Sequence, residues 1–525
     1  MNEHEIPQPE AVDKPASAPQ PAAQTLAGYA LPAGSPAYKA RQPYPRRRAG
    51  KRELILAGVL LVFCFLLWDA ICWAEGLGAG EALGLMALLP AALVYLRGRP
   101  GKLQGYGLCC AVLYLLGAAS LALSGDRSLK LLTLGALALL FFIVILERLE
   151  LRTGLGLFHR IHDLMAVSCS MTFGRLEPAC WALSHSGSAD GAHSQRNRAA
   201  LLGLVCAAPV LLILVPLLIA SDAAFEGLVG SLNWDAAGRG LAALGLGAMT
   251  ALLLFALLFT SDRGPEILPN RGRKGLEPAA VTAFLGAVSA AYVLYLLAQF
   301  AYFTDAFRGL LPKDYTVAQY ARRGFFEMCW IVAINLALIT GSLALCRRVE
   351  DRIPGAVKAL ALFLCLFSLG LVATALSKML LYMQSYGLTR LRVLTSVFMG
   401  FLAVVVAAEG LGLFVKRVPV IKLAVTLGAL VLLGLSLANV DGLVARYNVD
   451  AWKSGRLDSL DMETICWLGD GAVPTLTELA EDSDPKVAER AQKELKDRRP
   501  TGDGDLRSWN LVTQQAIQAL EAYKR

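Results

Sequence analysis

Charged side chains inside apolar runs are the residues of this sequence best placed to do chemistry. Asp69, Glu327 and Lys378 each stand within, or at the end of, a run long enough to cross a bilayer as a helix. A charge at that depth is costly unless it has a partner, water or a route to the surface. We therefore interpret these three residues as a candidate functional cluster.

The depth of these three charges favours pairing. In the topology predicted below, each lies within about 10 Å of the same membrane face, since a helix rises about 1.5 Å per residue. Two acids and one base at similar depth suggest an ion-paired group, although each side chain could also reach the headgroups alone. We expect Glu327 to be the acid nearest Lys378, with Asp69 as the alternative partner.

The composition indicates the elements that must position these charges. The chain has 525 residues, of which 56% are hydrophobic and only 18% are charged, and its mean hydropathy is +0.51. Soluble domains carry about 25% charged residues. Here the charges gather in short clusters between long apolar runs, a pattern typical of a multi-pass helical membrane protein. The net charge of +8 does not indicate nucleic-acid binding, because the basic residues lie where loops meet lipid.

The predicted fold is all-α, a polytopic transmembrane helical bundle of about eleven spans. Region 155–183 is apolar but interrupted by charges, so we expect a helix in the membrane interface there. The spans are predicted at residues 54–73, 82–96, 103–123, 129–146, 200–219, 240–259, 280–303, 325–345, 358–383, 393–413 and 420–438.

Charge also predicts orientation. Residues 1–50 are rich in Pro and Ala, which favours a disordered tail, and a basic cluster at Arg46–Arg52 precedes the first span. With this tail in the cytoplasm, the inner segments hold about 28 Lys and Arg and the outer loops about nine. An odd number of spans then places the C-terminus outside a plasma membrane. The lipid bilayer is the one certain partner of such a chain.

Residues 439–525 form the only substantial aqueous region of the predicted topology. Periodic apolar residues at 472–479, and an Asp484-Pro485 helix start before 487–495, predict a helix pair similar to one HEAT repeat. This small helical domain holds 16 acids against 12 bases. We expect it to dock on the basic outer loops that carry Arg322, Arg323 and Arg390.

Basic residues on outer loops oppose the usual charge bias and need a reason. Arg322, Arg323 and Arg390 could bind lipid headgroups, acids of the C-terminal domain or an anionic ligand. Polar residues that leave the ninth and eleventh spans gather on the same face. The candidate site residues are therefore Asp69, Glu327, Lys378, Arg322, Arg323, Tyr386, Thr389, Arg390, Asn439, Asp441 and Arg446.

Signatures of soluble enzymes are absent from the sequence, including the phosphate-binding loop and the serine nucleophile elbow. His159, His162 and Asp163 could share one helix face, but a metal would need a further donor such as His185 or His193. We favour a solvated helix face instead. The eleven cysteines lie mostly in apolar runs and behave as small hydrophobes. We expect neither a metal nor a cofactor.

Several short motifs occur together in the second half of the chain. They are Tyr320-Ala321-Arg322 with Gly324-Phe325 and Asn335, the run Tyr386–Arg392, Asn439 and Asp441 with Ala445–Asn448, Leu468-Gly469-Asp470 and Ala472-Val473-Pro474. Together they resemble a catalogued domain-of-unknown-function family of bacterial multi-pass membrane proteins, over roughly residues 200–480. The resemblance implies a helical fold in the bacterial plasma membrane and supplies no activity.

Three functions remain open at this point. We favour a non-enzymatic sensor or assembly protein of the envelope, with an envelope protein as its partner. A transporter could use Lys378 and neighbouring acids, although we find no clear internal repeat. An intramembrane enzyme acting on lipid or envelope precursors could use Glu327, Asp69 and Lys378 as titratable groups. The sequence names neither a ligand nor an oligomeric state.

Overall fold

The computed structural model describes most of the chain beyond the predicted N-terminal tail. Among the described residues the regular structure is helical, and one isolated bridge joins Leu276 to Cys346. The described residues are 48–72, 77–98, 103, 105–148, 176–186, 200, scattered positions between 203 and 221, 234–261, 275–307, 325–347, 349, 353–415, 418–498 and 507–524.

Eight of the described helices are long and apolar enough to cross a membrane. This indicates a helical membrane protein, as predicted. The α3 helix (Tyr106–Ser120) and the apolar part of α12 (Phe325–Leu345) are shorter, and the predicted span at 200–219 lies mostly outside the described residues. The eight are α1 (Lys51–Cys72), α2 (Ala79–Tyr95, continued by a 3-10 turn to Gly98), α4 (Arg127–Arg148), α9 (Trp234–Ser261), α10 (Pro278–Phe307), α13 (Gly355–Tyr386), α14 (Arg390–Gly412) and α15 (Val420–Leu437).

Helices α1–α4 and α9 share one hydrophobic core with α6 (Leu176–Ser184). The α6 helix is the described part of the region predicted to lie in the interface. Two side chains tie this group together: the Tyr114 hydroxyl donates to the Leu85 carbonyl at 2.9 Å, and Trp68 Nε1 donates to Thr250 Oγ1 at 2.8 Å. We call these helices the N-terminal helix group.

Helices α10 and α12–α14 share a second core, which we call the C-terminal helix group. A polar chain crosses it: the Tyr292 hydroxyl donates to Asn335 Oδ1 at 2.7 Å, and Asn335 Nδ2 donates to Ser368 Oγ at 3.0 Å. Asn335 and Ser368 are fully buried. A buried amide in an apolar bundle must find partners among neighbouring helices, so this chain fixes the register of three of them.

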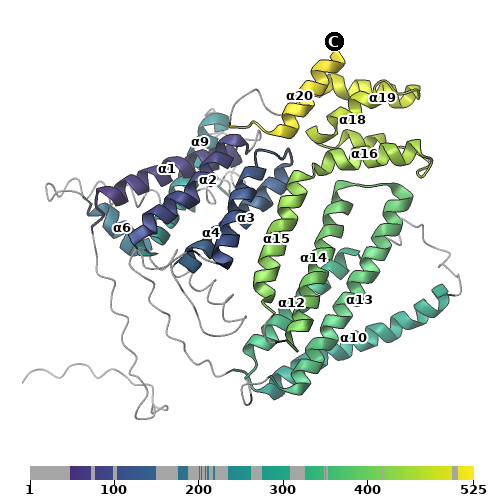
Figure 1. Ribbon diagram of the computed structural model, residues 1–525, viewed down its shortest axis with the longest axis horizontal. Coiled ribbons are helices and arrows are strands. Elements are labelled where there is room, and N and C mark those ends of the chain that lie inside the picture. The colour runs from purple at the N-terminus through teal and green to yellow at the C-terminus, as the bar shows by residue number, and fades with distance from the viewer. Residues whose placement is uncertain are drawn as a thin grey trace, which may run out of the picture. The chain divides into compact units, whose positions relative to one another are not determined.

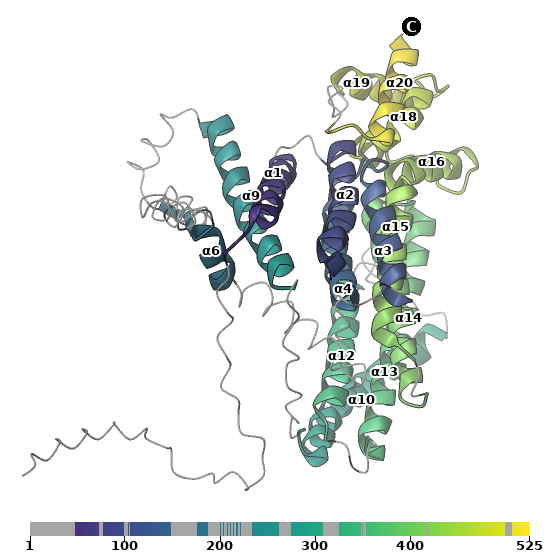
Figure 2. The ribbon, with the colours of Figure 1, turned by 60° about the vertical axis from the view of Figure 1, so that its left-hand side comes forward.

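Helix α15 lies between the two groups and packs against α3 and α4 on one side and α14 on the other (Figures 1 and 2). A hydroxyl pair, Thr133 Oγ1 and Ser436 Oγ at 3.4 Å, joins α4 to α15. The helix that enters the C-terminal region is therefore in contact with both groups.

The C-terminal helices lie at the end of the bundle where α13, α14 and α15 meet them (Figures 1 and 2). Their core includes Leu129 of α4, so it contacts the N-terminal helix group. The predicted helix start is present: Asp484 accepts from the Lys486 amide at 2.9 Å, and Pro485 follows it. The described elements are α16 (Val440–Lys453), α17 (Met462–Cys466), a 3-10 turn at Asp470–Ala472, α18 (Val473–Leu479), α19 (Pro485–Asp497) and α20 (Leu511–Lys524).

Candidate functional site

Three turns of the membrane bundle meet the C-terminal helices at one end of the molecule. At the start of α2, the Ala79 amide donates to the Trp509 carbonyl at 2.9 Å. After α3, the Leu511 amide donates to the Ala122 carbonyl at 2.9 Å. Between α13 and α14, the Asn448 side chain of α16 pairs with both backbone groups of Leu388, at 2.7 and 2.8 Å.

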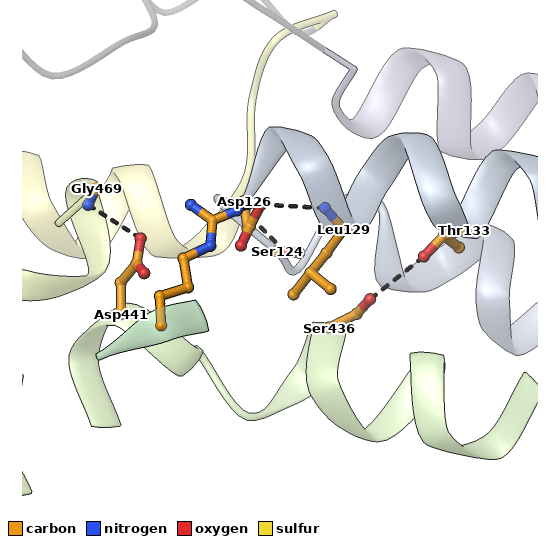
Figure 3. A network of polar contacts seen from close by, with 8 residues as sticks. Ser124, Asp126, Leu129, Thr133, Ser436, Asp441 and Gly469 are labelled. Atoms are coloured by element: carbon orange, nitrogen blue, oxygen red, sulfur yellow. Dashed lines mark hydrogen bonds and ion pairs between the residues drawn. The ribbon is translucent and has the colours of Figure 1, made fainter. Parts of the chain in front are cut away.

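Charged side chains from three elements meet at this end (Figure 3). Asp126 caps α4 by accepting from the Leu129 amide at 3.0 Å, and it also accepts from the Arg390 guanidinium at the start of α14. Asp441 of α16 accepts from the Gly469 amide at 2.9 Å. We call Asp126, Arg390 and Asp441 the junction cluster, because they belong to the N-terminal group, the C-terminal group and the C-terminal helices.

Burial dominates the electrostatics of the junction cluster. It raises the pKa of Asp441, while the Gly469 amide and then Arg390 favour the ionised form; Asp126 opposes ionisation and Arg498 favours it. Asp441 Oδ1, Asp126 Oδ2 and Arg498 Nη1 are buried and form no hydrogen bond within the described structure. The cluster and its neighbour Arg498 thus combine charges of both signs with buried polar atoms that lack a hydrogen-bond partner in the described structure.

A second group of charged contacts joins the segment before α20 to helices α1 and α2. Arg507, which precedes α20, lies 2.9 Å from Asp69 Oδ2 and 3.6 Å from Glu81 Oε1. Glu81 also accepts from the Gly78 amide at 3.0 Å. The structure therefore pairs Asp69 with Arg507, and the alternative pairing of Lys378 with Asp69 stays a prediction.

The predicted partners Glu327 and Lys378 belong to neighbouring helices. Glu327 is exposed in the first turn of α12, and Lys378 lies in α13, along which α12 packs. Their pairing stays a prediction. Arg322 and Arg323 lie outside the described residues. Arg390 does bind an acid, but that acid is Asp126 of the membrane bundle and not one of the C-terminal helices.

Two of the remaining predicted residues start helices. Thr389 caps α14 and accepts from the Arg392 amide at 3.4 Å, and Asn439 caps α16 by accepting from the amide three residues later at 3.3 Å. Asn439 adopts a left-handed backbone conformation with φ of 44°, which Asn tolerates better than most residues. Tyr386 and Arg446 are exposed. These two caps therefore fix where α14 and α16 begin, and so where Arg390 and Asp441 lie in their first turns.

Sequence reasoning missed the acid at the centre of the site. Asp126 precedes an apolar run by three residues, a helix N-cap signal that could have been found. Arg507 and Arg498 carried no such signal, because only folding brings them to Asp69 and to Leu468, whose carbonyl Arg498 binds.

No group of three His, Cys, Asp or Glu side chains that could hold a metal ion occurs in the part of the chain that is described. The nearest sequence candidates, His159, His162, Asp163 and His193, lie outside that part.

A family model described as "Domain of unknown function (DUF4153)" matches residues 82–479. The chain belongs to this family. The DUF4153 region runs from α2 to α18 and begins well before residue 200, where our predicted resemblance began. It contains the whole junction cluster, whereas Asp69 and Arg507 lie outside it. No curated protein and no solved structure matches the chain.

Proposed function

We propose that this chain is a non-enzymatic sensor or assembly protein of the bacterial envelope. Its C-terminal helices, seated on the outer end of the membrane bundle, present a surface to an envelope protein. The observation that carries the proposal is the junction cluster: its Arg390–Asp126 ion pair joins the two membrane helix groups, and Arg390 also interacts electrostatically with Asp441 of the C-terminal helices.

The seating of these helices supports a binding role. Buried charges contribute little net stability compared with apolar packing, but they specify one arrangement when each has its partner. The contacts of Asn448 with Leu388 and of Arg507 with Asp69 hold the same domain at two further points of the membrane bundle. A domain held at several points offers a partner a preorganised surface, which lowers the entropic cost of association.

The exposed face of α16 is the surface we assign to the partner. Leu443 is 55% exposed there, and Arg446 beside it is exposed as well. Arginine is enriched at protein interfaces, and burial of the Leu443 side chain against a partner would remove apolar surface from water.

The test places a photo-crosslinking amino acid at Leu443 of the full chain in living cells. We expect one discrete adduct with an envelope protein, which is lost when Arg390→Gln loosens the domain. Arg97→Gln, a matched change of an exposed arginine outside this surface, should leave the domain seated and the adduct present.

The opposite result would favour transport. If no adduct forms, and purified chain in lipid vesicles takes up a solute in a manner abolished by Lys378→Met, the proposal is wrong. Lys378 would then be part of a pathway across the bundle.

A further inference from the structure

An open cavity lies where the C-terminal helices meet the turn between α3 and α4. Its volume is about 550 Å³, within the range of about 300–1,000 Å³ that small-molecule sites occupy. Gly125 contributes the membrane-bundle side of the wall. The remaining lining residues come from the C-terminal region and are Cys466, Trp467, Leu468, Gly469, Asp470, Arg490, Glu494 and Arg498.

One face of α19 supplies charges of alternating sign to this wall. Arg490 and Glu494 are four residues apart on α19, so their side chains share a helix face, and Arg498 follows directly after the helix. Arg490 is exposed and Glu494 is partly exposed. The nearest approach of Arg498 to Glu494, 3.9 Å from Nη1 to Oε1, is too long for a hydrogen bond. The Glu494 carboxylate therefore retains capacity to bind a cation.

The acid at the other side of the wall is already engaged. Asp470 Oδ2 accepts from the Thr513 hydroxyl at 2.7 Å. The groups best placed to bind a ligand are thus the Arg490 guanidinium and the Glu494 carboxylate, with the positive charge of Arg498 behind them. A ligand that matches them carries a negative group and a positive group a few ångströms apart.

The position of the cavity and the exposed tryptophan on its wall point to a lipid headgroup as the ligand. Gly125 lies in the turn before α4, a helix of membrane-spanning length, so the cavity opens at the membrane boundary. Trp467 on its wall is 84% exposed, and tryptophan is enriched at the level of lipid headgroups. Arginine forks bind phosphate oxygens in pairs, and a carboxylate pairs with an ammonium group.

We propose that this cavity binds a phosphoethanolamine group, with its phosphate at Arg490 and Arg498 and its ammonium at Glu494. The same group occurs at the head of a bilayer lipid and in small water-soluble esters. The proposal is independent of the assembly role, because it concerns a different surface from the Leu443 face of α16.

The occupant would also touch the groups around the junction cluster. Gly125 neighbours Asp126, Gly469 donates to Asp441, and Arg498 binds the Leu468 carbonyl. A bound headgroup would therefore stabilise the backbone at Gly469, whose amide donates to Asp441.

Native mass spectrometry of the purified full chain tests the proposal. The protein in detergent is titrated with phosphatidylethanolamine, phosphatidylglycerol and phosphatidylcholine. We expect one tightly held phosphatidylethanolamine, and weaker binding of the other two, because glycerol lacks the cation and choline lacks N–H donors. Arg490→Gln and Glu494→Gln should each weaken phosphatidylethanolamine about tenfold, as expected for the loss of one charge-assisted hydrogen bond.

Lys493→Gln is the matched control, because Lys493 is exposed on the same helix and does not line the cavity. It should leave binding unchanged. Glu494→Gln should also leave phosphatidylglycerol unaffected. Soluble phosphoethanolamine, added as a competitor, separates the two sources: displacement at comparable concentration assigns the site to a soluble ester, and no displacement assigns it to lipid.

Equal binding of the three lipids would overturn the proposal. So would phosphatidylethanolamine binding that neither Arg490→Gln nor Glu494→Gln weakens in protein that remains folded by its thermal unfolding midpoint.

Discussion

At the scale of residues, the Asp126–Arg390 ion pair of the junction cluster joins the two membrane helix groups, and both charges act on Asp441 of the C-terminal helices. The Asp126 side chain is 10% exposed and that of Arg390 is 32% exposed, so water screens their attraction only in part. If either charge is removed, the other is left in a poorly solvated place without its partner. That asymmetry makes single changes more harmful than the double change.

We expect Asp126→Asn and Arg390→Gln each to lower the free energy of unfolding by about 1–3 kcal/mol. The double variant should lose less than the sum, since neither charge is then left alone. Thermal or denaturant unfolding of the four proteins in detergent measures the coupling. Simple additivity would contradict a direct ion pair.

Asp441 gives the cluster a pH dependence of definite sign. Burial raises its pKa, so the folded protein binds this proton more tightly than the unfolded chain does. Below about pH 3.9, the pKa of Asp in an unfolded chain, Asp441 is protonated in both states and does not destabilise the fold. Above that pH the unfolded chain loses the proton first, so the folded state is progressively destabilised until the pH exceeds the raised pKa of Asp441 in the folded protein. Stability from this group therefore falls as pH rises through that interval.

Asp441→Asn should remove this fall while keeping an oxygen that accepts from the Gly469 amide. The charged neighbours Arg390, Asp126 and Arg498 are unchanged, so the difference between the two proteins isolates Asp441. We expect the variant to become more stable relative to the natural protein as pH rises from about 4, measured as unfolding midpoints. A relative gain by the natural protein over that interval would refute the assignment.

At the scale of elements, the C-terminal segment before α20 is held by close backbone contact. An added Cβ at Gly78 would lie 2.3 Å from the Arg507 carbonyl oxygen, and one at Gly80 would lie 3.2 Å from Arg507 Cα. Gly78 is the N-cap of α2, and Gly80 lies in its first turn. They are needed because two backbones pass each other there.

Gly78→Ala should therefore displace the segment around Arg507 and cost about 1–3 kcal/mol of stability, as overpacking against backbone does. Gly135→Ala is the control, since a Cβ at Gly135 meets nothing within 4 Å. Limited proteolysis should release the C-terminal end faster from Gly78→Ala than from Gly135→Ala. Equal rates would mean that the segment is not fixed by this contact.

At the scale of the whole molecule, one end of the bundle collects the turns that the predicted topology assigns to the outer face. The α1–α2, α3–α4 and α13–α14 turns all contact the C-terminal region. Charge asymmetry along the sequence predicts that this end faces outward. The relative placement of the turns therefore agrees with a consistent alternation of the helices between them.

A reporter that is active only in the cytoplasm tests the orientation. Fused to Arg525 it should give no signal, whereas fused before Met1 it should be active. The physical reason is the excess of Lys and Arg in the segments predicted to be internal. Activity at Arg525 would place the C-terminal helices in the cytoplasm and remove the envelope partner from the proposed function.

The sequence by itself determined the class of fold and most helix positions. Runs such as 129–146 and 420–438 are long and uniformly apolar, so they predict helices whatever surrounds them, and α4 and α15 occupy them. Local cap chemistry likewise placed the start of α19 at Asp484-Pro485. The tertiary structure decided which charges meet. Arg507 reaches Asp69, and Asp126 reaches Arg390, across hundreds of residues, because partner choice depends on which helix ends share a membrane face and pack together, and no local pattern encodes that.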